Sequence, residues 1–153
     1  MQAHQDERRN EAMRLLAYDF NRPGLMSEAL QTPGSGVLLA GDRSVIDGNK
    51  IMALLGDSLI RTFVIEMMVN QNKATRDAID AQVQRSVNNV RLAEIFDTFG
   101  FVTCLNLNPS QGLAIGARTK ADTIKAIIGA VYMDGGDQGL DAVRRVAAHL
   151  NII

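Results

Sequence analysis

Two aspartates, Asp57 and Asp122, are the residues of this sequence best placed to do chemistry together. Asp57 directly follows Gly56, and Asp122 lies about two helical turns before Gly129. A glycine inside a helix costs about 1 kcal/mol relative to alanine, and a buried helix keeps one where a second backbone approaches closely. If Gly56 and Gly129 mark such a crossing, the two carboxylates converge beside it.

Each aspartate also has a plainer interpretation. Asp57 precedes Arg61 by one helical turn, so the two residues can form a surface ion pair worth a few tenths of a kcal/mol. Asp122 follows Thr119 at the spacing of a capping box, in which the acid only helps to start a helix. Periodicity alone leaves both interpretations open.

The helices that must position these residues follow from the spacing of apolar side chains. Asn49 is suited to cap a helix over about 50–70, whose core stripe recurs at three- or four-residue steps. The stripe consists of Met52, Leu55, Leu59, Phe63 and Met67. Thr119 is expected to open the second helix, which ends at 134–136.

The rest of the chain also reads as mainly helical. Further helices are expected over 11–17, 25–30, 75–87, 91–98 and 137–150, with Thr75 and Asp137 at the starts of the third and the last. Residues 31–48 are rich in Gly, Ser, Pro and Asp and predict a long loop. A short strand pair is possible at Leu105, Leu107, Leu113 and Ile115. The sequence therefore predicts an all-α fold.

Composition fits one globular domain and excludes several classes of protein. The chain has 153 residues, 46% of them apolar and 22% charged, with a net charge of −1 and thus no overall attraction to nucleic acid or anionic lipid. The single cysteine, Cys104, excludes an internal disulfide and a zinc knuckle. No apolar run is long enough to span a membrane, and the N-terminus lacks a secretory signal or a clear transit peptide. We therefore expect an intracellular protein with no membrane partner.

Four segments in register resemble the catalytic domain of ribonuclease III. The family's hallmark segment, N-E-R-L-E-F-L-G-D-[AS]-[VI]-L, is similar to NKIMALLGDSLI at 49–60, and its second segment is similar to KADTIKAIIGAVYMDGG at 120–136. The family's opening and middle helices resemble AYDFNRPGLMSEAL at 17–30 and RSVNNVRLAEIFDTFGF at 85–101. Order and spacing match over nearly the whole chain. The resemblance implies an all-helical bundle with the fold of an endonuclease.

The resemblance also implies a metal site, from which this chain departs. In active members, four carboxylates of the two segments hold Mg²⁺ ions that activate a water against a phosphodiester of double-stranded RNA. Asp57 and Asp122 match two of the four, but Ala53 and Lys125 stand where the family has glutamates. Lys50 replaces an outer glutamate of the first segment. Four negative charges thus become a net of −1 over Asp57, Asp122 and Lys125.

Lys125 is the departure with the clearest electrostatic consequence. Opposite charges 4 Å apart gain about 4 kcal/mol at an effective dielectric near 20, so an ammonium between two carboxylates compensates them as a metal does and repels a dication. We therefore expect Lys125 to occupy the position of the lost metal and to pair with both Asp57 and Asp122. In the alternative, its side chain extends into solvent, more than about 6 Å from both carboxylates.

These departures predict a non-catalytic, dimeric pseudo-nuclease that binds structured or double-stranded RNA or a protein partner and needs no cofactor. The homodimer, or heterodimer with a related domain, is expected to use the first-segment helix, where Leu54 takes the place of a family aromatic. Arg118 and Lys120 are candidates to contact RNA phosphate. The domain is expected over 15–150, after an extension and the start of the first helix at 1–14, with no double-stranded RNA-binding domain.

Two other functions stay open. A divergent, Mg²⁺-dependent endoribonuclease for double-stranded RNA would use Asp57 and Asp122, with an acid from elsewhere such as Asp77. A purely structural helical module would have no nucleic-acid partner. Cleavage of a long RNA duplex in the presence of Mg²⁺ separates the endoribonuclease from the pseudo-nuclease. Retardation of that duplex in a gel without cleavage separates the pseudo-nuclease from the structural module.

Overall fold

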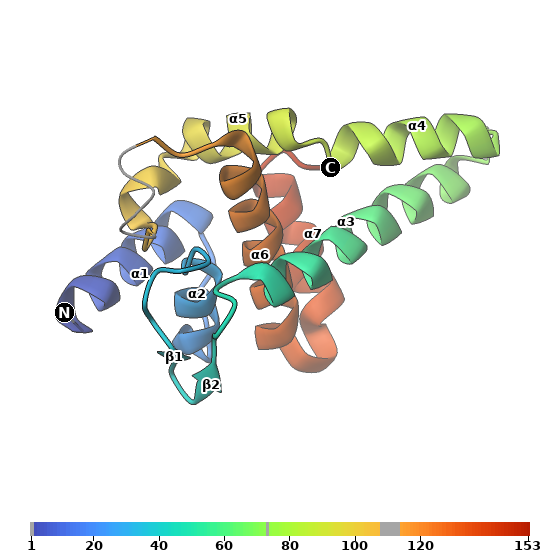
Figure 1. The fold of residues 1–153 in the computed structure, drawn as a ribbon. Helices are drawn as coiled ribbons and strands as arrows, with labels where there is room; N and C mark the ends of the chain where they lie inside the picture. The colour runs from blue at the N-terminus through green and yellow to red at the C-terminus, as the bar shows by residue number, and fades with distance from the viewer. Residues whose placement is uncertain (1, 73, 108–113) are drawn as a thin grey trace.

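The computed structural model describes residues 2–72, 74–107 and 114–153, which form an all-α domain (Figure 1). Its helices are α1 (Gln2–Leu16), α2 (Pro23–Ala29), α3 (Lys50–Gln71), α4 (Arg76–Ser86), α5 (Asn89–Phe99), α6 (Ala117–Gly135) and α7 (Gly139–His149), with 3-10 turns η1 (Phe101–Cys104) and η3 (Gly136–Gln138). The predicted fold class is confirmed. None of the helices in these ranges is long and apolar enough to cross a membrane.

The segment predicted as a long loop contains a minimal hairpin. Strands β1 (Leu39–Ala40) and β2 (Arg43–Ser44) pair antiparallel, with Ala40 opposite Arg43. An isolated parallel bridge joins Gln31 to Asn106. This bridge is a strand-like pairing within the described residues, and it lies between Leu105 and Leu107 of the predicted strand pair. Leu113, the third position of that prediction, lies outside the described residues.

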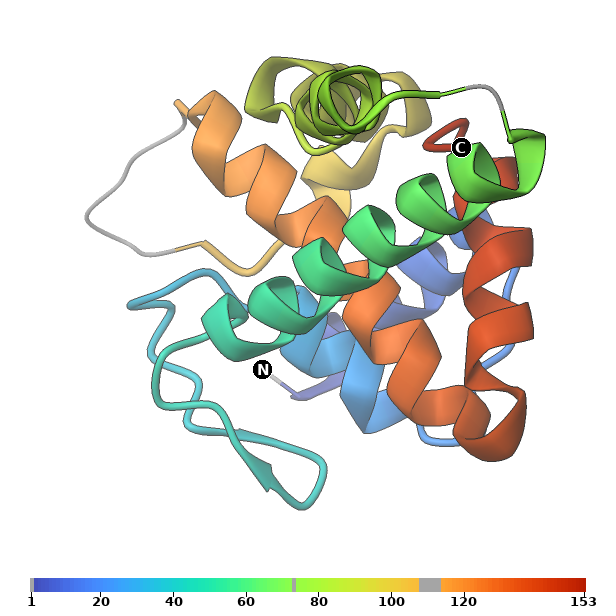
Figure 2. The ribbon, with the colours of Figure 1, turned by 90° about the vertical axis from the view of Figure 1, so that its right-hand side faces the viewer.

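Helix α6 is the centre of the fold, in contact with α2, α3, α5 and α7 (Figure 2). Ile124, Ile127, Ile128 and Val131 are completely buried on it. A helix that carries apolar residues on nearly all sides is stable only when other elements surround it. The helix that carries Asp122 is therefore also the core helix of the domain.

The predicted crossing of two glycines is confirmed. A Cβ atom added at Gly56 of α3 would overlap the backbone carbonyl group of Lys125, and one added at Gly129 of α6 would overlap the carbonyl oxygen of Met52. Because only glycine leaves room for this contact, the two backbones meet directly. The crossing fixes α6 beside the first two turns of α3.

The core stripe of α3 is buried at its beginning and exposed at its end. Met52, Leu59 and Phe63 are buried and Leu55 is half-buried, as predicted. The prediction was wrong for Met67, which is 40% exposed. The reason is that α3 continues beyond α6 and forms an arm with α4 (Figure 1), so its last turns leave the core.

Some predicted helix ends are confirmed and others are wrong. The hydroxyl of Thr75 accepts a hydrogen bond from the backbone N–H of Ala78, and Gly100 ends α5 with a positive φ of 77°. The first helix begins at Gln2, well before the predicted start. Asp137 does not cap α7, because it lies inside the 3-10 turn that joins α6 to α7.

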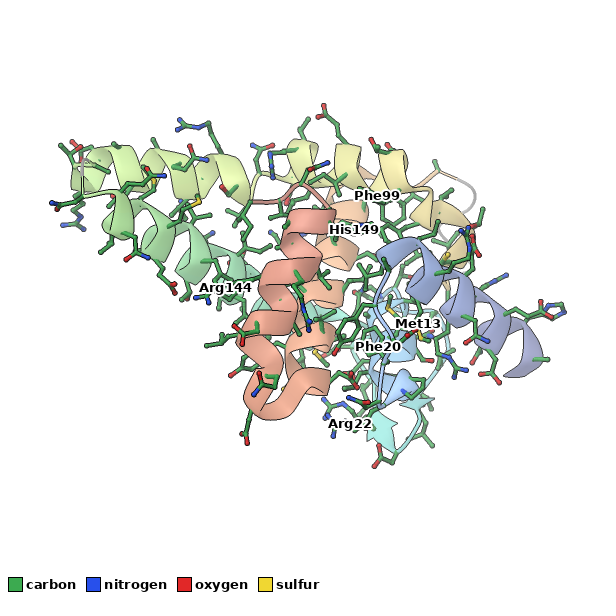
Figure 3. All side chains as sticks on the ribbon, turned by 180° about the vertical axis from the view of Figure 1, so that it is seen from behind. Met13, Phe20, Arg22, Phe99, Arg144 and His149 are labelled. Atoms are coloured by element: carbon green, nitrogen blue, oxygen red, sulfur yellow. The ribbon has the colours of Figure 1, made fainter. Side chains whose placement is uncertain are left out.

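Helix α7 contacts both α5 and α3; His149, Phe99 and Arg144 of these contacts are labelled in Figure 3. At its C-terminal end the ring of His149 lies 5.3 Å from the ring of Phe99 on α5. In its middle the Arg144 guanidinium lies 5.2 Å above the ring of Phe63 and 2.6 Å from the carboxylate of Glu66, both on α3. Helix α3 is therefore held by α7 as well as by the glycine crossing.

Candidate functional site

A cavity of about 590 Å³ opens where the first turns of α3 and α6 meet. It brings Asp57 and Asp122 together, as the glycine crossing predicts. It also brings three cations to the same place, which makes it an ionic site. Its lining residues are Pro33, Asn49, Lys50, Ala53, Leu54, Asp57, Arg118, Thr119, Asp122 and Lys125.

Asn49 is the N-cap residue of α3, as predicted, but its side chain bonds to other helices. Its buried side-chain amide donates hydrogen bonds to the carbonyl oxygen of Ala29 at 2.9 Å and to the hydroxyl of Thr123 at 3.3 Å. Its side chain makes no capping hydrogen bond, so Asn49 caps α3 with its backbone carbonyl group, which accepts from the N–H of Ala53 at 2.9 Å. A buried amide is satisfied by whichever partners packing brings to it. Here these come from α2 and α6, and they fix Lys50 at the cavity rim.

Helix α6 begins earlier than its capping-box pattern predicts. Its N-cap is Gly116, so Thr119 lies inside the first turn and Asp122 lies in the second. Asp122 is therefore not a capping residue. Its carboxylate lies 3.9 Å from the Arg118 guanidinium, one turn earlier on the same helix. The spacing of these two residues was a signal for the pair that the sequence analysis missed.

Lys125 crosses from α6 to α3. Its ammonium nitrogen lies 3.2 Å from a carboxylate oxygen of Asp57, and its side chain is only 13% exposed. The alternative that Lys125 extends into solvent is excluded. Asp57 also accepts a hydrogen bond from Arg61 at 2.7 Å, so its plainer interpretation holds at the same time. Among the described residues Lys125 forms no ion pair with Asp122, so this part of the prediction is wrong. Asp122 instead forms an ion pair with Arg118.

The two aspartates differ in their electrostatic surroundings. Burial alone would raise the pKa of Asp57, but the bound Arg61 and Lys125 outweigh it and hold the pKa below the ordinary value. Burial raises the pKa of Asp122, although Lys125 and Arg118 oppose the rise. Asp57 is thus the more firmly ionised carboxylate, and Asp122 the less compensated one.

Helices α3 and α6, which form this cavity, both lie within a segment that matches a known protein family. Residues 50–136 match the family profile described as "Ribonuclease III domain", which covers more than half of the chain. This chain belongs to the ribonuclease III domain family. The family predicted from the motifs is confirmed.

Individual ribonuclease III proteins are similar over most of the chain. "Ribonuclease 3" of Shewanella sediminis is 32% identical over 127 residues, which are 80% of this chain and 52% of that protein. "Ribonuclease 3" of Coxiella burnetii is 28% identical over 140 residues, which are 89% of this chain and 55% of that protein. The chain spans about half the length of these curated relatives.

Solved structures of a ribonuclease III nuclease domain share the fold. The crystal structure of the domain from Campylobacter jejuni matches with a TM-score of 0.76 at 18% identity, over 92% of this chain and 91% of that chain. A second structure of that domain, described for structural flexibility in a region involved in dimer formation, gives 0.75 at 19% identity. The predicted ribonuclease III-like bundle is confirmed.

The side chains of the cavity do not fit the four-carboxylate magnesium site that the ribonuclease III resemblance implies. Magnesium requires a near-octahedral set of oxygen ligands. The cavity offers Asp57, which two cations already bind, and Asp122; Ala53 has no ligand atom, and Lys50 and Lys125 are positive. No group of three or more acidic, histidine or cysteine side chains that could hold a metal ion occurs in the described parts of the chain.

The remaining predicted site residues lie at different places. Leu54 lines the cavity and is 70% exposed, and the side chain of Arg118 is 86% exposed at the cavity rim. Lys120 is outside the lining and pairs with Asp97 of α5 at 2.8 Å. Asp77 lies in the first turn of α4, beyond the far end of α3 and about 20 Å along that helix from the cavity. Asp77 is therefore not brought to the cavity of its own chain.

Replacing Lys125 with methionine should raise the pKa of Asp57, because one of its two cations is lost. A lowered pKa stabilises the folded state at neutral pH, and this stabilisation is lost as the pH falls through the folded pKa. The difference in stability between wild type and variant should therefore shrink in acid. Side-chain carboxyl NMR titration measures the pKa, with Lys120→Met, which removes the ion pair to Asp97, as the control. An unchanged Asp57 pKa would contradict the assigned ion pair.

Proposed function

We propose that this chain is a non-catalytic ribonuclease III-like domain that binds structured RNA as a dimer and needs no cofactor. The observation that carries the proposal is the 3.2 Å ion pair between Lys125 and Asp57. The ammonium group takes up the carboxylate at the place where the family resemblance implies a metal ligand. A divalent cation that entered there would have to break this half-buried ion pair, and the ammonium group of Lys125 would repel it.

The charge of the whole cavity supports the same proposal. Lys50, Arg118 and Lys125 line it against the two carboxylates of Asp57 and Asp122, so its net charge is positive. A cavity that gathers Mg²⁺ needs an excess of carboxylates. This one favours an anionic ligand over a cation, and the phosphate backbone of RNA is such a ligand.

The outer face of α3 supports a dimer. Apolar residues recur along this face at helical spacing, although the opposite face of the helix already packs on α6. They are Ile51, Leu54, Ile65 and Val69, exposed by 65%, 70%, 42% and 59%. An apolar stripe of this length marks an interaction surface. A second copy of this chain, presenting the same stripe about a two-fold axis, covers it on both partners.

The dimer has a sharp test in Leu54→Glu. A carboxylate placed within a two-fold interface is buried in both copies, so dimer affinity should fall by about a hundredfold or more. Sedimentation velocity at tens of micromolar protein should show a dimer for the wild type and a monomer for the variant. Val90→Glu is the matched control, since Val90 is 61% exposed on α5, away from the stripe. A monomeric wild type would refute the homodimer.

The absence of catalysis and the binding of RNA are tested together on a long RNA duplex with Mg²⁺. We expect the duplex to be retarded in a native gel and to remain uncut. Cleavage that Asp57→Asn abolishes would establish an enzyme instead. A duplex that is neither cut nor retarded would indicate a structural module or a protein partner.

One observation favours a second candidate, a divergent Mg²⁺-dependent endoribonuclease for double-stranded RNA. Asp57 and Asp122 line the same cavity, as the resemblance to active ribonuclease III domains implies for the two catalytic aspartates at these positions. Among the described residues the cavity lining holds no further acid, and Asp77 lies on α4, beyond the far end of α3. The cleavage assay above separates it from the first proposal.

A further inference from the structure

We propose that the cavity between α3 and α6 binds a phosphate group directly, without a metal ion, through Lys50 and Arg118 at its rim. This inference rests on the proposed function for its source of phosphate, the backbone of RNA. It assigns a ligand to the cavity that is opposite in charge to the magnesium ions implied by the family resemblance.

Two cations at the rim have charge that no partner fully takes up. Lys50 is exposed at the first position of α3 and forms no ion pair with any residue in the described ranges. The side chain of Arg118 is 86% exposed, and among the described residues its only ion pair is the 3.9 Å contact with Asp122. An ammonium and a guanidinium on facing walls of one cavity are the side chains that proteins use to hold phosphate oxygens.

The inner wall does not cancel this positive charge. Asp57 is bound by Arg61 and by Lys125, so these three residues together carry one positive charge. Asp122 is the other lining carboxylate, and its ion pair is the 3.9 Å contact with Arg118. An anion entering the cavity therefore meets a net positive field.

The backbone adds two further positive ends. Helices α3 and α6 both begin on the same side of their crossing (Figure 2), and residues of both first turns line the cavity. Neither start has a side-chain cap: the N-cap of α6 is Gly116, and the amide of Asn49 is used by α2 and α6. The partial positive charge of a helix start favours a phosphate. The volume of about 590 Å³ is within the range of about 300–1,000 Å³ for small-ligand sites.

The proposal predicts an unusual sign for one substitution. In a metal site, Asp122→Asn removes a ligand and weakens binding. Here it removes the carboxylate that repels the phosphate, so phosphate affinity should rise about fivefold. Lys50→Gln and Arg118→Gln should each lower it about tenfold and reduce the salt dependence of RNA binding by about one ion.

The experiment uses the whole chain in buffer with EDTA. Inorganic phosphate is titrated while backbone amide NMR shifts are followed, and a short RNA duplex is titrated by calorimetry. We expect phosphate to shift amides of residues 50–54 and 117–122 and to compete with the duplex. Arg76→Gln is the matched control, because Arg76 is a 93% exposed cation on α4, away from the cavity.

The outcomes separate this inference from the proposed function. No phosphate-dependent shifts at the cavity, or unchanged affinity in both Lys50→Gln and Arg118→Gln, would overturn the phosphate site. If the duplex still bound in that case, RNA binding would stand and lie elsewhere on the molecule. Phosphate binding without duplex binding would support the site and refute RNA as its source.

Discussion

Replacing Gly56 with alanine should lower the free energy of unfolding by about 3 to 4 kcal/mol, a large effect for one methyl group. The added Cβ overlaps the carbonyl group of Lys125, which belongs to the backbone of the core helix and cannot rotate away as a side chain would. The two helices must then move apart, and the contact between Lys125 and Asp57 lengthens with them. Urea denaturation at one fixed protein concentration measures the loss.

A second glycine provides the control for this substitution. Gly116, at the start of α6, has a φ of −74° and open space where a Cβ would be, so Gly116→Ala should cost less than about 1 kcal/mol. Gly129→Ala, at the other side of the crossing, should behave like Gly56→Ala, because its Cβ overlaps the carbonyl oxygen of Met52. Equal and small losses at all three positions would mean that the backbones are not in contact.

The double variant Ala53→Glu with Lys125→Glu should gain Mg²⁺ binding, with an affinity about a hundredfold or more above that of the wild type. It places four carboxylates around the cavity and removes the ammonium that binds Asp57. Isothermal titration calorimetry measures the binding. Mg²⁺ should also raise the thermal stability of the variant, since four neighbouring carboxylates repel one another until a divalent cation joins them.

The matched control has the same shapes without the charges. Ala53→Gln with Lys125→Gln changes the volume of the cavity in the same way but adds no carboxylate, so it should not gain Mg²⁺ binding. Because Ala53 is only 5% exposed, this control also measures what a larger side chain costs there. Calorimetry identical for the Glu and Gln variants would show that the two positions do not face a common ion.

The replacement of a metal ion by a lysine changes what holds the two helices together at the cavity. A divalent ion would link several carboxylates at once, whereas Lys125 links α6 to Asp57 alone. Asp122 is left with a looser contact to Arg118 on its own helix. This asymmetry leaves a positive rim and one weakly compensated carboxylate, from which the phosphate site is inferred.

Prediction from sequence succeeded where local sterics decide the structure. The Thr75 hydroxyl caps α4, and Gly100 ends α5 in the left-handed region, because both depend on a few neighbouring residues. It failed where a distant partner offers an alternative. Asn49 is at the predicted cap position, but its side-chain amide bonds to α2 and α6 and not to α3. Thr119 lies within a helix that had already begun at Ala117.

By itself, the sequence determined the ribonuclease III-like helical fold and the side chains available at its site. These are two aspartates, with Ala53 and Lys125 in place of two family acids. The sequence also predicted the helix crossing, because a glycine within a helix indicates a position where another backbone comes close. Only the tertiary structure decided that Lys125 binds Asp57 and not Asp122. The physical reason is that a lysine in reach of two carboxylates takes the one that backbone packing brings closest, and packing depends on the whole chain.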